Sequence, residues 1–497
     1  MNKKNIDYKR LAIFVIVIGI FLRFALASIY TVSGDACWQL SASRFIAENR
    51  AFPLSENIGR QEPFWPPPLF HIMAALMYSI FGVFGFAEFG MKMLSPLLGS
   101  LTLIIAYKIN KKLFSEKITF YSMLFTVFLP FFIDYHIFGY IDGAVTFFAV
   151  LGIYFALDGR YIKSAISAGL CAITKYNGIF IVPALVYITY KKSKDKSLFF
   201  KRIMIMLLVM SATALPWLVR NYANFGNPFW PFMNFIFKGM DTSAFESADV
   251  QNFSLARILH PNSLIFTYLA LFGVPDGNYQ AIFFFGIPHV KFLFVIWLLA
   301  TLFFILPFAK SLRIKDKTTK GILLAWILPF AAVLALYIGN ANWTAARFFM
   351  PAIPALGILY GVGLSSVNFK NNNLKRIFFV SILIIIFGFI AAESAKIALA
   401  SKEWNKYKED FKWIEGNTEK GALLMPGAQC LAYHAKRGTL KQSIKNIENA
   451  DYIFVNRNFK LERRSIVSDE FLEEVKKRKY GIVYENNETG TSIHKVK

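Results

Sequence analysis

The stretch YKINKKLFSEK, residues 107–117, decides how this chain is threaded through a membrane. It carries four lysines and lies between two apolar runs, at roughly 90–107 and 118–133. Short loops rich in lysine and arginine stay on the cytoplasmic side of a bilayer. We therefore expect residues 107–117 to form a cytoplasmic loop, with the two flanking runs crossing the membrane in opposite directions.

The whole chain has the composition of a membrane protein. Of its 497 residues, 56% are hydrophobic and 53 are phenylalanine. Several apolar runs approach or exceed the roughly 20 residues that a helix needs to cross a bilayer. The formal net charge is +24, but the lysines and arginines lie in short clusters between the apolar runs. This pattern excludes a soluble enzyme and favours membrane topology over nucleic-acid binding as the reason for the positive charge.

The other basic clusters settle which apolar runs cross the membrane. The clusters are DGRYIK (158–163), YKKSKDKSLFFKR (190–202), KSLRIKDKTTK (310–320) and NFKNNNLKR (368–376). Two apolar runs lie between Asp35 and Lys108. If both crossed the membrane, the basic clusters would face outward; if only one crosses, all of them face the cytoplasm. We therefore expect residues 67–85 to form an outer interfacial or re-entrant helix, and the run from Gly90 to be the second span.

This threading predicts a polytopic α-helical protein with about eleven transmembrane helices. Basic residues before the first apolar run place the N-terminus in the cytoplasm, and that run is predicted to be an uncleaved anchor. The later spans are expected at roughly 118–133, 143–157, 162–174, 178–190, 203–219, 291–309, 321–338, 351–366 and 377–394.

The character of the chain changes from Ser401 onward. Apolar runs vanish, and short strand-like segments alternate with helix-like segments such as SDEFLEEVKKRK (468–479). We therefore expect a membrane-embedded domain over 1–395 and a small extracytoplasmic α/β domain over 401–497. Cys37 and Cys430 are both predicted outside, so a bridge between them is open, although nothing in the sequence fixes their separation.

The predicted outer loops hold an unusual set of charged and aromatic residues at helix ends. Each has a structural explanation: Asp35 can cap the next helix, the other acids can be solvated, and the cations can anchor at the interface or bind lipid headgroups. His71 is more typical of a satisfied interfacial histidine than of a ligand. The candidate site residues are Asp35, Trp65, Asp134, Asp142, Lys175, Tyr176, Arg220 and Arg347.

The order of several segments resembles the GT-C glycosyltransferases that use lipid-phosphate sugars, above all the protein O-mannosyltransferases and the aminoarabinose transferases of lipid A. The match covers most of residues 1–395. Two departures concern metal binding: Ala36 and Cys37 follow Asp35 where many relatives have a second acid, and Glu62 does not align with a metal-associated acid. The matching segments are SGDACWQLSASRFIAENRAFP (33–53), PPPLFHIMAALMYSIFG (66–82), DGAVTFF (142–148), TKYNG (174–178), PWLVRNYANFGNPFWP (216–231) and RFFMPAIPAL (347–356).

The resemblance implies transfer of a sugar from a polyprenyl-phosphate donor to an acceptor hydroxyl at the outer face, with inversion. In this reading Asp35 is the catalytic base. Asp142, or as the weaker alternative Asp134, is a second carboxylate that orients the acceptor or helps to hold a divalent metal. The remaining candidates would bind substrate: Arg347, Arg220, Lys175, Tyr176, Trp65 and Asp134.

Three alternatives stay open at this stage: a transporter or flippase of lipid-linked sugars, a glycan polymerase or ligase, and a structural membrane protein. The expected partners are the bilayer, the lipid-linked donor and a protein, lipid or glycan acceptor, with no nucleic acid. The sequence does not specify the sugar, the acceptor, the metal or the oligomeric state.

Overall fold

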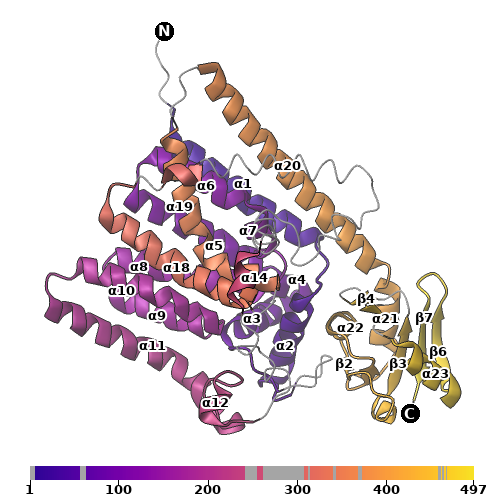
Figure 1. Cartoon of the computed structure of the whole chain (residues 1–497). Helices are drawn as coiled ribbons and strands as arrows, with labels where there is room; N and C mark the ends of the chain where they lie inside the picture. The colour runs from indigo at the N-terminus through magenta and orange to yellow at the C-terminus, as the bar shows by residue number, and fades with distance from the viewer. Residues whose placement is uncertain are drawn as a thin grey trace.

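The structure is a computed structural model of the whole chain (Figure 1). It describes the chain outside residues 1–5, 56–62, 241–253, 261–306, 312–313, 340–342, 368–371, 457–459, 462–463, 466 and 497.

Helices dominate residues 8 to 405. In chain order they are α1 (Tyr8–Ile29), α2 (Asp35–Asn49), α3 (Leu69–Gly82), α4 (Ala87–Lys92), α5 (Leu94–Leu113), α6 (Glu116–Phe128), α7 (Pro130–Asp134), α8 (Ile141–Leu157), α9 (Tyr161–Ala172), the 3₁₀ helix η1 (Tyr176–Ile181), α10 (Val182–Lys192), α11 (Lys196–Phe225), α12 (Asn234–Phe237), α14 (Leu255–Leu259), α18 (Lys317–Gly339), the 3₁₀ helix η3 (Trp343–Ala352), α19 (Ile353–Ser365) and α20 (Asn372–Asn405).

Six of the described helical stretches are long and apolar enough to cross a membrane: Tyr8–Ile29, Ala87–Leu113, Lys196–Phe225, Lys317–Ile338, Ala346–Ser365 and Arg376–Asn405. The spans expected at 118–133, 143–157, 162–174 and 178–190 are the shorter helices α6, α8, α9 and α10. The span expected at 291–309 lies largely outside the described residues, so the total of eleven remains a prediction.

The basic clusters gather at one end of the bundle, which we call the basic end. Lys112 forms an ion pair with Asp158. The Lys117 ammonium donates to the carbonyl of Ser365 at 3.4 Å, so the start of α6 lies beside the end of α19. The end of α10 and the start of α18 line the same cavity as Lys112. Residues from four predicted cytoplasmic loops, 107–117, 158–163, 190–202 and 310–320, therefore lie at this end.

The opposite end of the bundle, which we call the site end, holds α2 and α3. The amide of Leu69 donates to the carbonyl of Ile173 at 3.0 Å, and the Tyr78 hydroxyl donates to Glu48 at 2.9 Å, so both ends of α3 lie there. This arrangement favours a non-spanning helix at 67–85.

Topology can be tested by labelling single cysteines in a cysteine-free background. We expect a cysteine at Lys111, an exposed position at the basic end, to be protected in intact cells and labelled only after permeabilisation. Cysteines at Asp35, Arg347 and Asp451 should react from outside. Labelling of position 111 from outside would contradict the single crossing between residues 67 and 107.

A mixed sheet with helices on it follows α20, drawn in yellow at the end of the long orange helix in Figure 1. Its strand order is β2-β1-β3-β7-β6, with β1 parallel to both neighbours and β7 antiparallel to both of its own. α20 is continuous across the predicted boundary at 395–401, and the division into two domains stays a prediction. The remaining elements are α21 (Lys408–Asn417), β1 (Leu423–Met425), α22 (Gln429–Ala435), β2 (Gly438–Thr439), the 3₁₀ helix η4 (Ile447–Asn449), β3 (Tyr452–Asn456), the two-stranded pair β4 (Lys460–Leu461) and β5 (Arg464–Ser465), α23 (Asp469–Arg478), β6 (Gly481–Asn486) and β7 (Thr491–Lys495).

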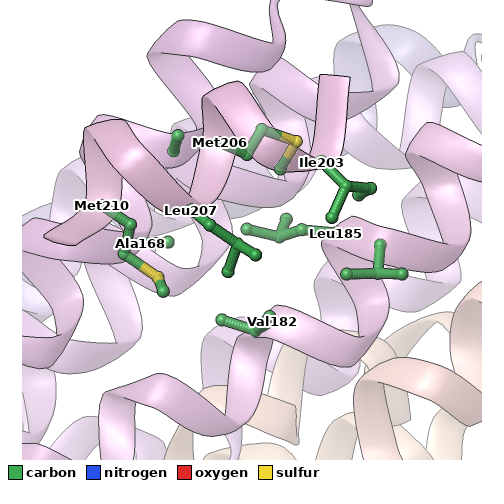
Figure 2. A pocket seen from close by; sticks show the side chains of 9 residues that line it. Ala168, Val182, Leu185, Ile203, Met206, Leu207 and Met210 are labelled. Atoms are coloured by element: carbon green, nitrogen blue, oxygen red, sulfur yellow. The ribbon is translucent and has the colours of Figure 1, made fainter. Parts of the chain in front are cut away.

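An apolar cavity lies between α9, α10 and α11, with Leu185, Ile203 and Met206 among its walls (Figure 2). Its volume is about 20 Å³, and its lining is entirely apolar. A lipid chain needs far more room than this, so the cavity is a packing gap beneath α11 rather than a substrate channel.

Candidate functional site

Asp35 is the first residue of α2, at the site end. Gly34 takes the N-cap position with φ at 61°, and the Tyr140 hydroxyl accepts a hydrogen bond from the Asp35 amide. A side chain at position 34 would place its Cβ 2.7 Å from the Tyr140 oxygen, so this close approach requires glycine. Asp35 is therefore the first helical residue and not the N-cap, so the structural alternative that Asp35 caps this helix does not hold.

The Asp35 carboxylate instead contacts Arg347, which is 312 residues away in the sequence. Arg347 Nη1 lies 2.5 Å from Asp35 Oδ2, and both side chains are partly exposed, at 22% and 28%. Arg347 lies on η3, the 3₁₀ helix between α18 and α19. A partly exposed charge pair of this kind can exchange one partner for a substrate group, because solvent and ligand can reach it.

A second ion pair lies beside the first. Lys175 Nζ is 2.6 Å from Asp142 Oδ1, with the carboxylate at the start of α8 and the ammonium just before η1. Burial lowers the pKa of Lys175 from its ordinary value, opposed by the charge of Asp142, while Arg347 lowers it further and Asp35 raises it. We call Asp35, Asp142, Lys175 and Arg347 the charge cluster; the structure brings these four predicted site residues together.

Two polar atoms of the charge cluster lack a partner among the described residues. Arg347 Nε is a buried donor, and Asp142 Oδ2 is a buried acceptor. Unpaired buried polar groups are costly, so they are typical of sites completed by a ligand or by water. The cluster therefore has one donor and one acceptor to offer a bound substrate.

Aromatic rings form one wall of the charge cluster. Lys175 Nζ lies 4.2 Å from the centre of the Phe348 ring, which stacks on Tyr337 at 4.1 Å. Arg347 lies 5.9 Å from the Tyr140 ring. These rings exclude water from one side of the cations and strengthen their electrostatic field.

Arg220 lies at the same end, where its guanidinium contacts loop carbonyls and an aromatic ring. Its guanidinium donates to the carbonyls of Phe64 at 2.9 Å and Pro53 at 3.3 Å, and it stacks over Trp217. These contacts fasten the loop between α2 and α3 to α11. The carbonyl bonds occupy Nη1 and Nη2, and the phosphate role of Arg220 remains a prediction.

Tyr176 and Trp65 belong to an aromatic group beside that loop. The Tyr176 hydroxyl accepts hydrogen bonds from Trp217 Nε1 and Asn221 Nδ2, both at 3.0 Å. Trp65 packs on Trp38 with ring centres 5.8 Å apart. Trp38 follows Asp35 by one turn of α2, so these rings lie next to the charge cluster, and their contact with substrate remains a prediction.

His71, on α3, is fully buried and bonded at both ring nitrogens. Its Nδ1 lies 3.2 Å from the carbonyl of Pro67, and its Nε2 lies 2.5 Å from Gln39 Oε1. Burial lowers the pKa of His71 to about 4, so the ring is neutral. A neutral ring that donates through Nδ1 must accept through Nε2, which requires the Gln39 amide nitrogen to face it. The expectation of a satisfied histidine is confirmed.

Asp134 stands apart from the charge cluster. Its Oδ2 lies 2.6 Å from Lys396 Nζ on α20, and Glu393 pairs with the same lysine. Burial raises the pKa of Asp134 well above its ordinary value; the Glu393 carboxylate raises it further, and Lys396 opposes this. The structure therefore groups Asp134 with α20 rather than with the predicted substrate-binding residues.

Sequence reasoning did not assign Tyr140, Glu393 or Lys396. Glu393 and Lys396 could have been found, because ionisable residues inside an apolar helix are rare and usually paired. Tyr140 gave no such signal, since its role depends on the approach of its hydroxyl to Gly34.

The C-terminal region holds α2 in place. A disulfide joins Cys37, two residues after Asp35, to Cys430 on α22. Arg44 donates to the carbonyl of Tyr433 at 2.8 Å and pairs with Glu88 at 3.3 Å. The bridge that the sequence left open therefore forms, and it ties the helix that carries Asp35 to the α/β region.

The donor set at the charge cluster does not fit a divalent metal. Each of its two carboxylates has one oxygen paired with a cation, Asp35 with Arg347 and Asp142 with Lys175, and these adjacent positive charges disfavour a divalent cation. The described part of the chain holds no group of three or more histidine, cysteine or acidic side chains suited to a metal.

Comparison with solved structures identifies the architecture. ArnT from Cupriavidus metallidurans bound to undecaprenyl phosphate matches over 97% of both chains, at 13% identity with a TM-score of 0.65. The chain has the GT-C fold. The GT-C resemblance read from the sequence is thereby confirmed, and with it a multi-pass membrane protein.

A second solved structure, a family model and a sequence relative also match the chain. AglB, the oligosaccharyltransferase of Archaeoglobus fulgidus, in complex with an inhibitory peptide and a dolichol-phosphate, matches 99% of this chain and 75% of its own, at 11% identity and a TM-score of 0.58. The family of dolichyl-phosphate-mannose-protein mannosyltransferases matches residues 66–219. An uncharacterised protein of Aquifex aeolicus is 23% identical over 404 residues, covering 80% of this chain and 82% of its own.

Proposed function

We propose that this protein transfers a sugar from a polyprenyl-phosphate donor to an acceptor hydroxyl. The observation that carries the proposal is the charge cluster at the site end of a GT-C fold, where Asp35 and Arg347 meet 2.5 Å apart beside Asp142 and Lys175. A carboxylate that can accept a proton lies beside cations that can bind a phosphate. These are the two requirements of the reaction.

Asp35 would act as the general base. The acceptor hydroxyl attacks the anomeric carbon while its proton passes to the Asp35 carboxylate, and the bond from that carbon to the phosphate oxygen breaks. Attack from the side opposite the phosphate inverts the anomeric centre. A positioned base of this kind contributes roughly 10²- to 10⁴-fold.

Arg347 and Lys175 would stabilise the departing polyprenyl phosphate. Negative charge grows on the leaving oxygen, and preorganised cations aimed at it stabilise it. Arg347 has a donor, Nε, without a partner among the described residues. Its guanidinium can therefore keep Asp35 on one edge and bind a phosphate oxygen on another.

We propose further that the site end faces outside the cytoplasm. The basic clusters occupy the opposite end, as the positive-inside rule requires of the cytoplasmic side. The disulfide between Cys37 and Cys430 lies at the site end, and disulfides persist in oxidising compartments. Two independent features thus point to the same orientation.

The proposal is tested with purified protein and a set of polyprenyl-phosphate sugars in detergent. We expect release of polyprenyl phosphate with at least one sugar, dependent on an added acceptor. A flippase would move the donor across vesicles and leave the sugar–phosphate bond intact. That result would replace the transferase proposal with the transporter alternative.

Turnover should not need a divalent metal. Treatment with a chelator such as EDTA is expected to change the rate less than about twofold, since Arg347 and Lys175 supply the positive charge that a metal would provide. The rate is measured with and without chelator, then after adding back magnesium, manganese or calcium. Loss of activity that one of these ions restores would show that the cations of the cluster do not suffice.

A further inference from the structure

A second cavity opens at the basic end, far from the charge cluster. Its volume is about 440 Å³, within the range of small-molecule pockets. The ends of α5, α8 and α10 and the start of α18 surround it. The proposed transfer reaction does not use it.

Three lysines and an aliphatic wall line this cavity. The lysines are Lys112, Lys191 and Lys192, and the wall includes Leu157, Ile188 and Ile322. Ile188 and Ile322 are almost completely buried, at 1% and 4% exposure, whereas Lys191 and Lys192 are exposed. The cavity is therefore apolar towards the bundle and cationic at its mouth.

The positive charge at the mouth is only partly neutralised. Lys112 pairs with Asp158, but neither Lys191 nor Lys192 forms an ion pair with any described residue. The other nearby carboxylate, Asp316, accepts from the amides of Thr318 and Thr319 at the start of α18, and it also attracts the Lys191 charge without forming an ion pair with it. Lysines at the ends of helices also favour the helix dipole, but a dipole does not explain an open cavity between four helices.

We infer that this cavity binds the headgroup of an anionic phospholipid. A phosphate at the mouth would meet Lys191 and Lys192, and the acyl chains would run along the aliphatic wall into the bilayer. Lysine binds phosphate as a compact point charge, and basic pockets between helices suit anionic lipid headgroups. A free phosphate shares the charge chemistry but leaves the aliphatic wall uncovered.

Lipid binding is measured by native mass spectrometry and by thermal stability of the full-length protein in detergent. The probes are phosphatidylglycerol, phosphatidylcholine and inorganic phosphate. We expect phosphatidylglycerol to bind and to raise the melting temperature more than phosphatidylcholine does, with inorganic phosphate giving no comparable rise. Equal effects of the two lipids, or an equal effect of inorganic phosphate, would overturn the assignment.

Two double variants separate the cavity from its basic surroundings. Lys191→Gln with Lys192→Gln should weaken phosphatidylglycerol binding on the order of tenfold, because two charges near the headgroup are lost. The matched control is Lys194→Gln with Lys196→Gln, in the same exposed segment but outside the cavity lining. Equal weakening by both pairs would show a general basic surface and no site. Melting without lipid confirms that each variant is folded.

Discussion

Replacing Asp35 with asparagine is expected to slow the chemical step of sugar transfer roughly 10²-fold or more. Asparagine keeps the size of the side chain and some of its hydrogen bonding, but it cannot take the proton of the acceptor hydroxyl. Donor affinity should change little, since the phosphate contacts are assigned to Arg347 and Lys175. Single-turnover transfer and donor affinity, measured side by side, test this prediction.

The ion pair with Arg347 supplies a competing explanation, because the substitution also breaks a contact 2.5 Å long. A matched control is Asp158→Asn, which breaks the Lys112–Asp158 ion pair at the basic end. If broken ion pairs alone mattered, both variants would lose thermal stability and retain transfer in proportion to folded protein. A stable Asp35→Asn protein with wild-type single-turnover transfer would show that Asp35 is not the base.

The gathering of the basic clusters at one end of the bundle was predictable because charge acts over whole loops. Each basic cluster favours the cytoplasmic side independently of its neighbours, so the ends of helices could be assigned without their contacts. The same reasoning predicts that segment 67–85 does not cross the membrane and that the run after it does, and this remains a prediction. Helix lengths were less predictable: Pro130 interrupts the predicted span 118–133, so α6 ends at Phe128.

The pairing within the site was not predictable from order alone. The sequence predicted Asp35, Asp142, Lys175 and Arg347 at one membrane face. It predicted Arg220 and Asp134, two further charged residues, at the same face. These two residues differ from the charge cluster in their tertiary contacts. Arg220 donates to loop carbonyls. Asp134 faces Lys396 from α20, a partner 262 residues away.

The cysteines illustrate the same limit. Topology placed Cys37 and Cys430 on one side, but their bridge depends on the docking of α22 against α2 over a separation of 393 residues. No local pattern encodes that docking. Once formed, a bridge across so long a loop restricts the unfolded chain strongly, and the stability of α2 becomes tied to the α/β region.

Arg347→Ala is expected to lower turnover roughly 10²- to 10³-fold, in line with losing a preorganised group that stabilises a developing anion. Lys175→Ala should cost less, because an ammonium offers a point charge whereas a guanidinium can hold two oxygens at once. Arg347→Lys should fall between them, since it keeps the charge and loses the fork. Turnover of the three variants, measured with saturating donor, tests this order.

If Arg347 had a purely structural role, its replacement would change thermal stability and leave the affinity for polyprenyl phosphate unchanged. Its loss would leave Asp35 beside Asp142 with only Lys175 to neutralise two carboxylates, and the protein would melt at lower temperature. Affinity for free polyprenyl phosphate would then stay unchanged. If Arg347 binds the leaving group, that affinity falls in Arg347→Ala together with turnover, and in Arg347→Lys it falls less. Wild-type affinity for polyprenyl phosphate in a folded Arg347→Ala protein would therefore remove Arg347 from the phosphate site and leave it only the task of holding Asp35.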